Sequence, residues 1–240
     1  KTFDNGTVCA SEQALVVEKK VAEAFEPLLE KEGAFFCSDE QAAALGEIAF
    51  DSANRIMRAD AVGQPASELA KRAGFQVPAK TKLLIAPCHG VGRGHPLSYE
   101  ILTPILSYYV VEDYREALAM CVRLSALGGQ GHTVSIYANK EQAIKDFSTY
   151  LSAGRVCVNT PATHGAIGGT YNTLDPSFTL SCGTQAGNIF TDNITTTHLL
   201  NIRRIARRRP NTRWFAIQDF EWLDAEIDGN EILKKYNRNF

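Results

Sequence analysis

Two alternating hydrophobic patterns run through residues 1–158. Apolar runs of four to seven residues alternate with longer segments in which apolar positions recur every three or four residues, the spacings of buried strands and amphipathic helices. The predicted strands are 14–18, 82–86, 105–111, 133–137 and 155–158, and the predicted helices are 19–31, 39–53, 66–73, 114–127 and 140–152. Strands that alternate with helices form βαβ units. The pattern therefore predicts an α/β fold, with a mainly parallel sheet flanked by helices.

The pattern changes after residue 158. Residues 159–198 are rich in Thr, Gly, Asn and Ser and show little periodicity. An irregular segment of that length in a compact domain is usually functional or packed against another element. Residues 199–209 are basic and residues 219–228 are acidic. We predict a domain over 1–209 and a peripheral C-terminal tail over 210–240.

Composition excludes several classes of partner. The chain has 240 residues, of which 45% are hydrophobic and 22% charged, and its formal net charge is -2. That balance favours neither nucleic acid nor an anionic membrane. No apolar run approaches the ~20 residues that a membrane span needs. We expect a small-molecule substrate, no nucleic acid and no membrane.

The six cysteines are scattered along the sequence. None forms a C-x-x-C pair, so the spacing gives no support to a zinc site, and we expect no metal. Scattered thiols are typical of a reducing compartment rather than of a disulfide framework. We therefore predict a cytoplasmic protein.

Cys9 is the cysteine with the most informative surroundings. Asn5-Gly6 is a chain-reversal signal, which puts Cys9 on a turn just before the predicted strand 14–18. A thiol in that place can be a nucleophile that adds to a carbonyl carbon. It can also be a small buried hydrophobic side chain, as most free cysteines are. The local sequence leaves both interpretations open.

The segment around Cys9, residues 3–13, resembles the catalytic-cysteine motif of the aldehyde dehydrogenase superfamily, and of its CoA-acylating branch most closely. Four further blocks carry the resemblance, which covers residues 1–209: 99–104, 128–133, 159–169 and 179–201. The resemblance implies the fold of the catalytic domain of these enzymes. It also implies that the Rossmann half, which binds the dinucleotide, lies ahead of Lys1. We therefore expect a piece of a longer polypeptide that is inactive alone and whose parent is a homo-oligomer.

The resemblance also implies site residues. Cys9 would be the nucleophile, and His132 the base or the activator of the CoA thiol. The Glu-x-x-x-Pro segment from Glu100 to Pro104 would contact the nicotinamide ribose through its glutamate. The loops that close over the thiol and the cofactor would carry the remaining cofactor-binding candidates, Asn159, Thr160, Cys182 and Gly183.

The activity implied by the resemblance joins an aldehyde, CoA and NAD or NADP to give an acyl-CoA. Two alternatives stay open: a hydrolytic aldehyde dehydrogenase that releases a free acid, and a non-catalytic relative that serves as a scaffold. The loop with His89, Arg93 and His95 is more basic than expected of an acetaldehyde enzyme. We hypothesise that these three residues select a negatively charged acyl group.

Overall fold

The computed structural model describes residues 1–208 and 212–237. The chain divides into two compact units, with the boundary between Leu199 and Leu200. The boundary predicted at 209/210 falls on residues outside the described part, so it stays a prediction. Each unit is described by itself below.

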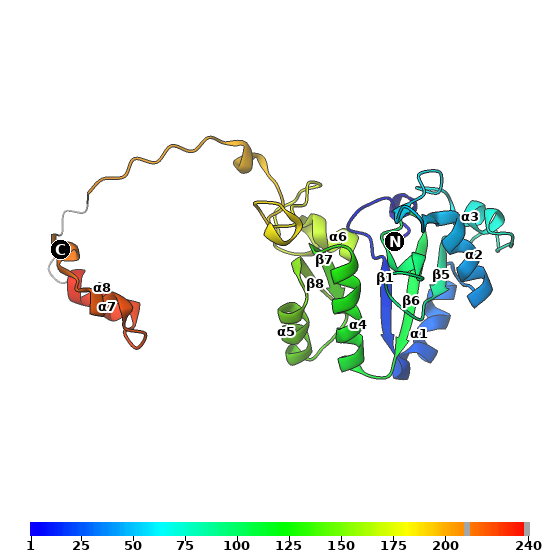
Figure 1. Cartoon of the computed structure of the whole chain (residues 1–240), viewed down its shortest axis with the longest axis horizontal. Helices are drawn as coiled ribbons and strands as arrows, with labels where there is room; N and C mark the ends of the chain where they lie inside the picture. The colour runs from blue at the N-terminus through cyan, green and yellow to red at the C-terminus, as the bar shows by residue number, and fades with distance from the viewer. Residues whose placement is uncertain (209–211, 238–240) are drawn as a thin grey trace. The chain divides into compact units, whose positions relative to one another are not determined.

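The main sheet of the first unit has four strands, all parallel, in the order β1 (Ala14–Glu18), β6 (Ile105–Val111), β5 (Leu83–Pro87) and β2 (Ala34–Phe36) (Figure 1). The predicted parallel α/β architecture is confirmed. Strand β2 was not predicted, since three residues are too few to display a period.

Helices cover both faces of this sheet. Helices α2 (Asp39–Ala49) and α3 (Ala66–Arg72) pack on one face, and α1 (Lys19–Lys31) packs on the other. Strand β5 shows why the sheet is buried on both sides. Leu84 and Ala86 point into the α2–α3 core and Leu83 and Ile85 into the α1 core, so successive side chains alternate between two apolar layers.

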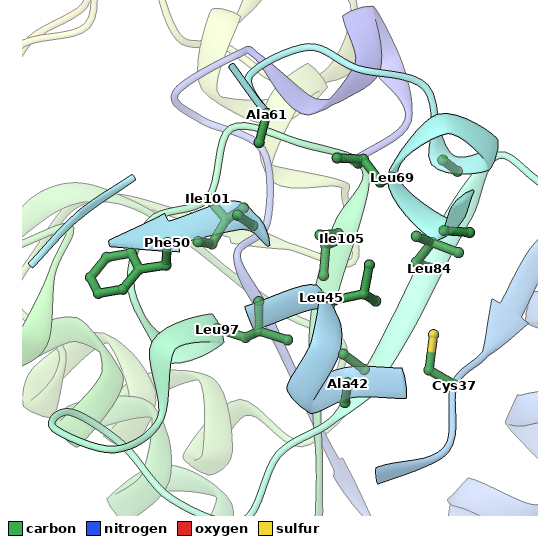
Figure 2. Packing of buried hydrophobic residues seen from close by; sticks show 14 residues of the cluster. Cys37, Ala42, Leu45, Phe50, Ala61, Leu69, Leu84, Leu97, Ile101 and Ile105 are labelled. Carbon is green, nitrogen blue, oxygen red and sulfur yellow. The ribbon is translucent and has the colours of Figure 1, made fainter. Parts of the chain in front are cut away.

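The α2–α3 core is the larger of these two layers. Leu45 from α2, Leu69 from α3 and Leu84 from β5 converge there and are all fully buried (Figure 2). Ile101, in the segment that leads into β6, and Ile105, the first residue of β6, pack into the same core. The segment containing Glu100 and Pro104 is therefore anchored by its apolar members.

A second, two-stranded parallel sheet follows in sequence, formed by β7 (Gly131–Ile136) and β8 (Ala153–Val158). Helix α5 (Glu141–Tyr150) packs on β8, and α6 (Ala162–Ile167) packs on both strands. Helix α4 (Tyr114–Leu127) packs against β1, β6 and α5, and Figure 1 shows it between the two sheets.

The helix predicted over 39–53 is shorter than expected. It begins as predicted, because Ser38 and Gln41 form a reciprocal capping box. It ends at Ala49, because Phe50–Asp51 pairs as β3 with β4 (Ile56–Met57) in a hairpin. The Asp51 carboxylate turns the chain by accepting hydrogen bonds from the amides of Ala53 and Asn54, both at 3.0 Å.

The low-periodicity region contains α6, which was not predicted, and several single-turn 3-10 helices. After α6 these turns span Gly169–Tyr171, Thr184–Ala186 and Thr196–Leu199. A bridge between Leu180 and Asn193 folds the intervening residues back on themselves. We refer to residues 179–194 as the return loop.

The second unit contains a 3-10 turn (Thr212–Ala216), α7 (Asp219–Leu223) and α8 (Gly229–Asn237). Glu221 is buried, pairs with Lys235 and accepts a hydrogen bond from the Tyr236 hydroxyl at 2.5 Å. These bonds, the one from Lys235 first, lower the pKa of Glu221 to about 2. The predicted tail thus has internal structure of its own.

None of the helices within residues 1–208 and 212–237 combines the length and the apolar character that crossing a membrane requires.

Leu45→Ala should lower the free energy of unfolding by about 2–5 kcal/mol, since it leaves a cavity in the α2–α3 core. The matched control is Leu28→Ala on α1, whose side chain is 59% exposed and which should change stability by ~0.5 kcal/mol or less. Denaturant unfolding followed by circular dichroism measures both. Equal losses for the two variants would contradict this assignment of the core.

Candidate active site

Cys9 lies on an exposed turn just before β1, as the sequence predicted. The 3-10 turn Phe3–Gly6 precedes it, with Asp4 and Asn5 in the left-handed region at φ 49° and 48°. Asn and Asp are the non-glycine residues that adopt this conformation most readily. The thiol is therefore held at the surface by a turn, and the interpretation of Cys9 as a buried hydrophobic residue is wrong for this structure.

Gly6 presses this turn against the segment that leads into β6. Its φ is 77°, and a Cβ atom at this position would overlap the carbonyl oxygen of Thr103. The Asn5 Nδ2 also donates a hydrogen bond to the carbonyl of Gly63 at 3.0 Å. Only glycine fits such an approach, so Gly6 brings the cysteine turn into contact with the Glu100–Pro104 segment.

Lys1 ties the same two segments together. Its Nζ donates to the carbonyl of Ile101 at 2.8 Å and to the Gln13 Oε1 at 3.0 Å. Gln13 Oε1 also accepts from the amide of Ile101 at 2.9 Å. Burial lowers the pKa of Lys1 to about 7, against the opposing attraction of Glu12 and Glu100. The residues on both sides of Cys9 are thus fixed to one backbone segment.

Glu12 joins the cysteine segment to the second sheet. Its Oε1 accepts a hydrogen bond from the amide of Ala162 at 2.7 Å, at the first residue of α6. An unpaired amide at a helix start is a good donor to a carboxylate. The segment that bears Cys9 is therefore attached to both sheets of the first unit.

His132 follows Gly131 at the start of β7 and is half-buried. Its Nδ1 lies 3.1 Å from the Thr133 Oγ1. Burial, and then the positive charge of Arg155, lower the pKa of His132 below its usual value. The imidazole is therefore uncharged at neutral pH, the form that a general base requires.

Arg155, on β8, was not among the predicted site residues. It is only 4% exposed. Burial lowers its pKa, and the sulfur atoms of Cys182, Cys157 and Cys9 are near enough to oppose that effect. The signal in the sequence was an arginine within the apolar strand pattern 153–158, a place where a charge needs dedicated partners.

The return loop brings Cys182 and Gly183 to this site. The Cys182 carbonyl packs directly against Gly131, where φ is 74° and a Cβ atom would overlap the carbonyl oxygen. Burial raises the pKa of Cys182, while Arg155 opposes the rise and Cys9 adds to it. Gly183 is buried and its amide donates to the Phe190 carbonyl at 2.7 Å. Cys9, Cys182, Arg155 and His132 thus form one electrostatically linked group.

Asn159 and Thr160 lie elsewhere, at the carboxyl end of β8, whereas His132 lies at the amino end of the parallel strand β7. The Asn159 side chain exchanges two hydrogen bonds with the backbone of Ala138, at 3.0 and 3.1 Å. The Thr160 carbonyl accepts from the Ser135 hydroxyl at 3.0 Å. These bonds join the ends of the two strands, and cofactor binding by Asn159 and Thr160 stays a prediction.

Glu100 is exposed, whereas Pro104, four residues later in the sequence, is fully buried. Two of the three basic residues of the preceding loop have identified surroundings. His89 pairs with Asp39 at 2.8 Å, whereas Arg93 lines a cavity of about 560 Å³. The hypothesis that His89, Arg93 and His95 select a charged acyl group stays a hypothesis.

Among the side chains of residues 1–208 and 212–237 that are described, no three of the His, Cys, Asp and Glu type are grouped so that they could hold a metal ion.

Iodoacetamide at pH 7.5 should alkylate Cys9 more than about tenfold faster than Cys37, because only an accessible thiolate reacts. Cys37 is buried, and burial raises its pKa to about 12. Peptide mass spectrometry over a time course gives both rates. Comparable rates in the folded protein would contradict the exposed placement of Cys9.

Gly6→Ala should destabilise the chain more than Gly74→Ala. Both glycines have positive φ, 77° and 85°, but a Cβ at Gly74 meets no atom within 4 Å. Gly74→Ala should therefore cost about 1–2 kcal/mol from backbone strain alone. Gly6→Ala adds the overlap with Thr103, and denaturant unfolding should show the larger loss; a smaller loss would mean that the turn does not press on Thr103.

The comparisons with known proteins agree with this geometry, although no family model matches the chain. The aldehyde-alcohol dehydrogenase of Streptococcus pneumoniae serotype 4 (strain ATCC BAA-334 / TIGR4) is 36% identical over 98% of the chain, which covers 27% of that protein. An acetylating aldehyde dehydrogenase from Geobacillus thermoglucosidasius superposes with a TM-score of 0.78 at 38% identity, over 87% of this chain and 47% of that one. A probable aldehyde dehydrogenase from Listeria monocytogenes EGD-e gives a TM-score of 0.82 at 39% identity, over 88% and 46%.

The chain therefore spans about a quarter of the curated relative and about half of each solved one. Its sequence and its fold agree with theirs over most of its length. On that evidence the chain is similar to a part of an aldehyde-alcohol dehydrogenase and to about half of an acetylating aldehyde dehydrogenase.

Proposed function

We propose that this chain supplies the catalytic-cysteine part of an acylating aldehyde dehydrogenase, which interconverts an aldehyde, CoA and NAD(P)+ with an acyl-CoA and NAD(P)H. The observation that carries the proposal is the exposed Cys9 thiol, held on a clamped turn within electrostatic reach of the buried Arg155. Positive charge beside a partly exposed thiol is the setting of a reactive cysteine.

Cys9 performs the covalent step. Its thiolate sulfur forms a bond to the aldehyde carbon, and the carbonyl π electrons move to the oxygen, which gives the alkoxide of a thiohemiacetal on Cys9. Loss of hydride from that carbon leaves a thioester on the same sulfur. The CoA thiolate then adds to the thioester carbonyl, and the Cys9 sulfur departs with the electron pair of its bond to the acyl carbon.

His132 takes the proton of the CoA thiol in this scheme. Burial and Arg155 lower the pKa of its imidazole and keep it uncharged at neutral pH, so that a ring nitrogen can accept a proton. The same imidazole returns the proton when the reaction runs toward the aldehyde. General-base assistance of this kind contributes on the order of a hundredfold or more to a rate.

The nicotinamide cofactor, when bound, supplies the acceptor for the hydride. The exposed Glu100 carboxylate would hold its ribose, because an unburied carboxylate beside a fixed backbone segment can accept hydrogen bonds from hydroxyl groups. Lys1, Gln13 and Ile101 keep this segment beside the cysteine turn. Cys182 and Gly183 in the return loop would cover the thiol on its other side.

We also infer a cytoplasmic, homo-oligomeric parent protein. All six cysteines are free, which fits a reducing compartment. The first unit ends in an exposed apolar side chain at Leu199 and, beyond it, Leu200, Ile202 and Ile205 are exposed as well. A run of exposed apolar residues is typical of a surface that another chain covers.

Cys9→Ala in the full-length enzyme should abolish CoA-dependent aldehyde oxidation, measured as NAD(P)H formation, because the variant lacks the sulfur on which the thioester forms. Cys121→Ser on α4 is the control, and it should retain activity. Circular dichroism should show that both variants fold. Turnover retained by Cys9→Ala would reject the assignment of the nucleophile.

The same assay separates the alternatives. Omission of CoA should stop turnover after the first acylation. Continued turnover with release of free acid would favour the hydrolytic activity instead. If the protein without substitutions shows no turnover, and its Cys9 also reacts slowly with iodoacetamide, the non-catalytic scaffold would be favoured.

A further inference from the structure

The guanidinium of Arg155 is buried without an ion pair among the described residues. Its side chain donates instead to four uncharged oxygens: Ser181 O at 2.8 Å, Thr191 O at 3.0 Å, Thr133 Oγ1 at 3.1 Å and Asn193 Oδ1 at 3.4 Å. Removing an arginine charge from water without a counter-charge is costly. Such a charge keeps its field, because dipoles orient around it without neutralising it.

Three of these four bonds go to the return loop. Ser181 and Thr191 offer backbone carbonyls from its two limbs, and Asn193 closes the loop where it bridges to Leu180. Asn193 in turn donates through Nδ2 to the carbonyls of Ala166 and Asp175, both at 2.8 Å. A single side chain on β8 thus fixes the loop that carries Cys182.

The fourth bond leads to His132. Arg155 Nε–H donates to the Thr133 Oγ1, which lies 3.1 Å from the His132 Nδ1. Because arginine is only a donor, Thr133 must accept from it. The Thr133 oxygen retains a second lone pair, which can accept from Nδ1–H and so leave Nε2 free as the basic nitrogen.

We propose that Arg155 is a positioning residue, which orients His132 through Thr133 and holds the return loop against the Cys9 turn. This assignment rests on the proposed function, for which His132 is the base. The surrounding charges support it. The titratable groups linked to Arg155 are Cys157 on the same strand, Cys182 and Asp192 on the return loop and Cys9 on its turn, and Arg155 is the cation among them. The Asp192 carboxylate is largely exposed and lies 3.5 Å from the His198 Nε2.

The positive charge of Arg155 and the fork of N–H donors on its guanidinium group have separate consequences. The charge disfavours a second positive charge on His132, so its removal should raise the pKa of that imidazole. The fork holds Ser181 and Thr191, so its loss should loosen the loop even if the charge stays. Loss of a purely structural residue would loosen the return loop without a change in the pKa of His132.

The test uses the full-length enzyme and three variants. Arg155→Gln removes the charge, Arg155→Lys keeps the charge without the fork, and Thr133→Val breaks the relay while it keeps the shape. Arg115→Gln on α4, an exposed arginine, is the matched control. Circular dichroism shows whether each variant folds. If Arg155→Gln does not fold, the separate variants Thr133→Val and Arg155→Lys still test the proposal.

The first readout does not depend on turnover. Diethyl pyrocarbonate modifies only uncharged imidazole, so the pH dependence of modification in the His132 peptide, followed by mass spectrometry, reports its titration. Arg155→Gln should move the midpoint to higher pH, whereas Arg155→Lys should leave it near that of the unaltered enzyme. An unchanged midpoint in Arg155→Gln would overturn the electrostatic part of the proposal; if that variant does not fold, a midpoint in Arg155→Lys moved to higher pH would do so.

The second readout is kinetic. Thr133→Val should lower kcat on the order of tenfold or more, with little change in the aldehyde KM, since a misplaced base affects the reaction rather than binding. In Arg155→Gln the acid limb of the pH–rate profile should move to higher pH. If all three variants raised KM and lowered kcat by equal factors, and the acid limb of the pH–rate profile did not move, Arg155 would be a structural residue only.

The two proposals fail separately. If Cys9→Ala remains active, the proposed function fails, whatever Arg155 does. If Cys9→Ala is inactive but Arg155→Gln behaves like Arg115→Gln, the function stands and the role of Arg155 is rejected.

Discussion

The site depends on the attachment of the Cys9 segment to two other parts of the first unit. On one side of the segment, Lys1 and Gln13 bind the backbone of Ile101, and Gly6 lies against Thr103, both ahead of β6. On the other side Glu12 binds the start of α6. An exposed thiol on a free turn would sample many positions, at an entropic cost to any reaction that needs one of them. The two attachments remove that freedom before a substrate arrives.

The second sheet places a titratable and a charged side chain near this fixed thiol. β7 contributes His132, and β8 contributes Arg155, which lie close together because the strand register pairs Thr133 with Arg155. Parallel pairing of these strands therefore decides which groups share the site. The site uses a histidine that is easily kept neutral beside an arginine that is always charged, and the contrast lets one site hold both a proton acceptor and a fixed cation.

The sequence predicted the architecture and the exposed position of Cys9, because both depend on local signals. Strand and helix periods in β1, α1, β6 and α4 are long enough to read, and Asn5-Gly6 marks the turn at Cys9. It did not predict β2, whose three residues show no period, or the end of α2 at Ala49, which tertiary pairing of β3 with β4 decides.

Arg155 shows why part of the site escaped sequence reasoning. Its role depends on partners 22 to 38 positions away, from Thr133 to Asn193, and no spacing rule joins them. Asn159 shows the converse. Its place in a family block predicts cofactor binding, which stays a prediction, and the coordinates add that its side-chain amide bonds the backbone of Ala138. A motif identifies a residue, but only coordinates show which atoms remain available.

The hydrogen bonds that define the site join residues far apart along the chain, with separations of 100 positions between Lys1 and Ile101 and 150 between Glu12 and Ala162. Contacts of such range require most of the loop-closure entropy to be lost before they form. The site therefore forms only when segments that are distant in sequence have come together, as the pairing of β1 with β6 also requires. Until then Cys9 lacks the fixed position that these contacts give it, so a nascent or misfolded molecule carries the thiol without the surroundings of the folded site.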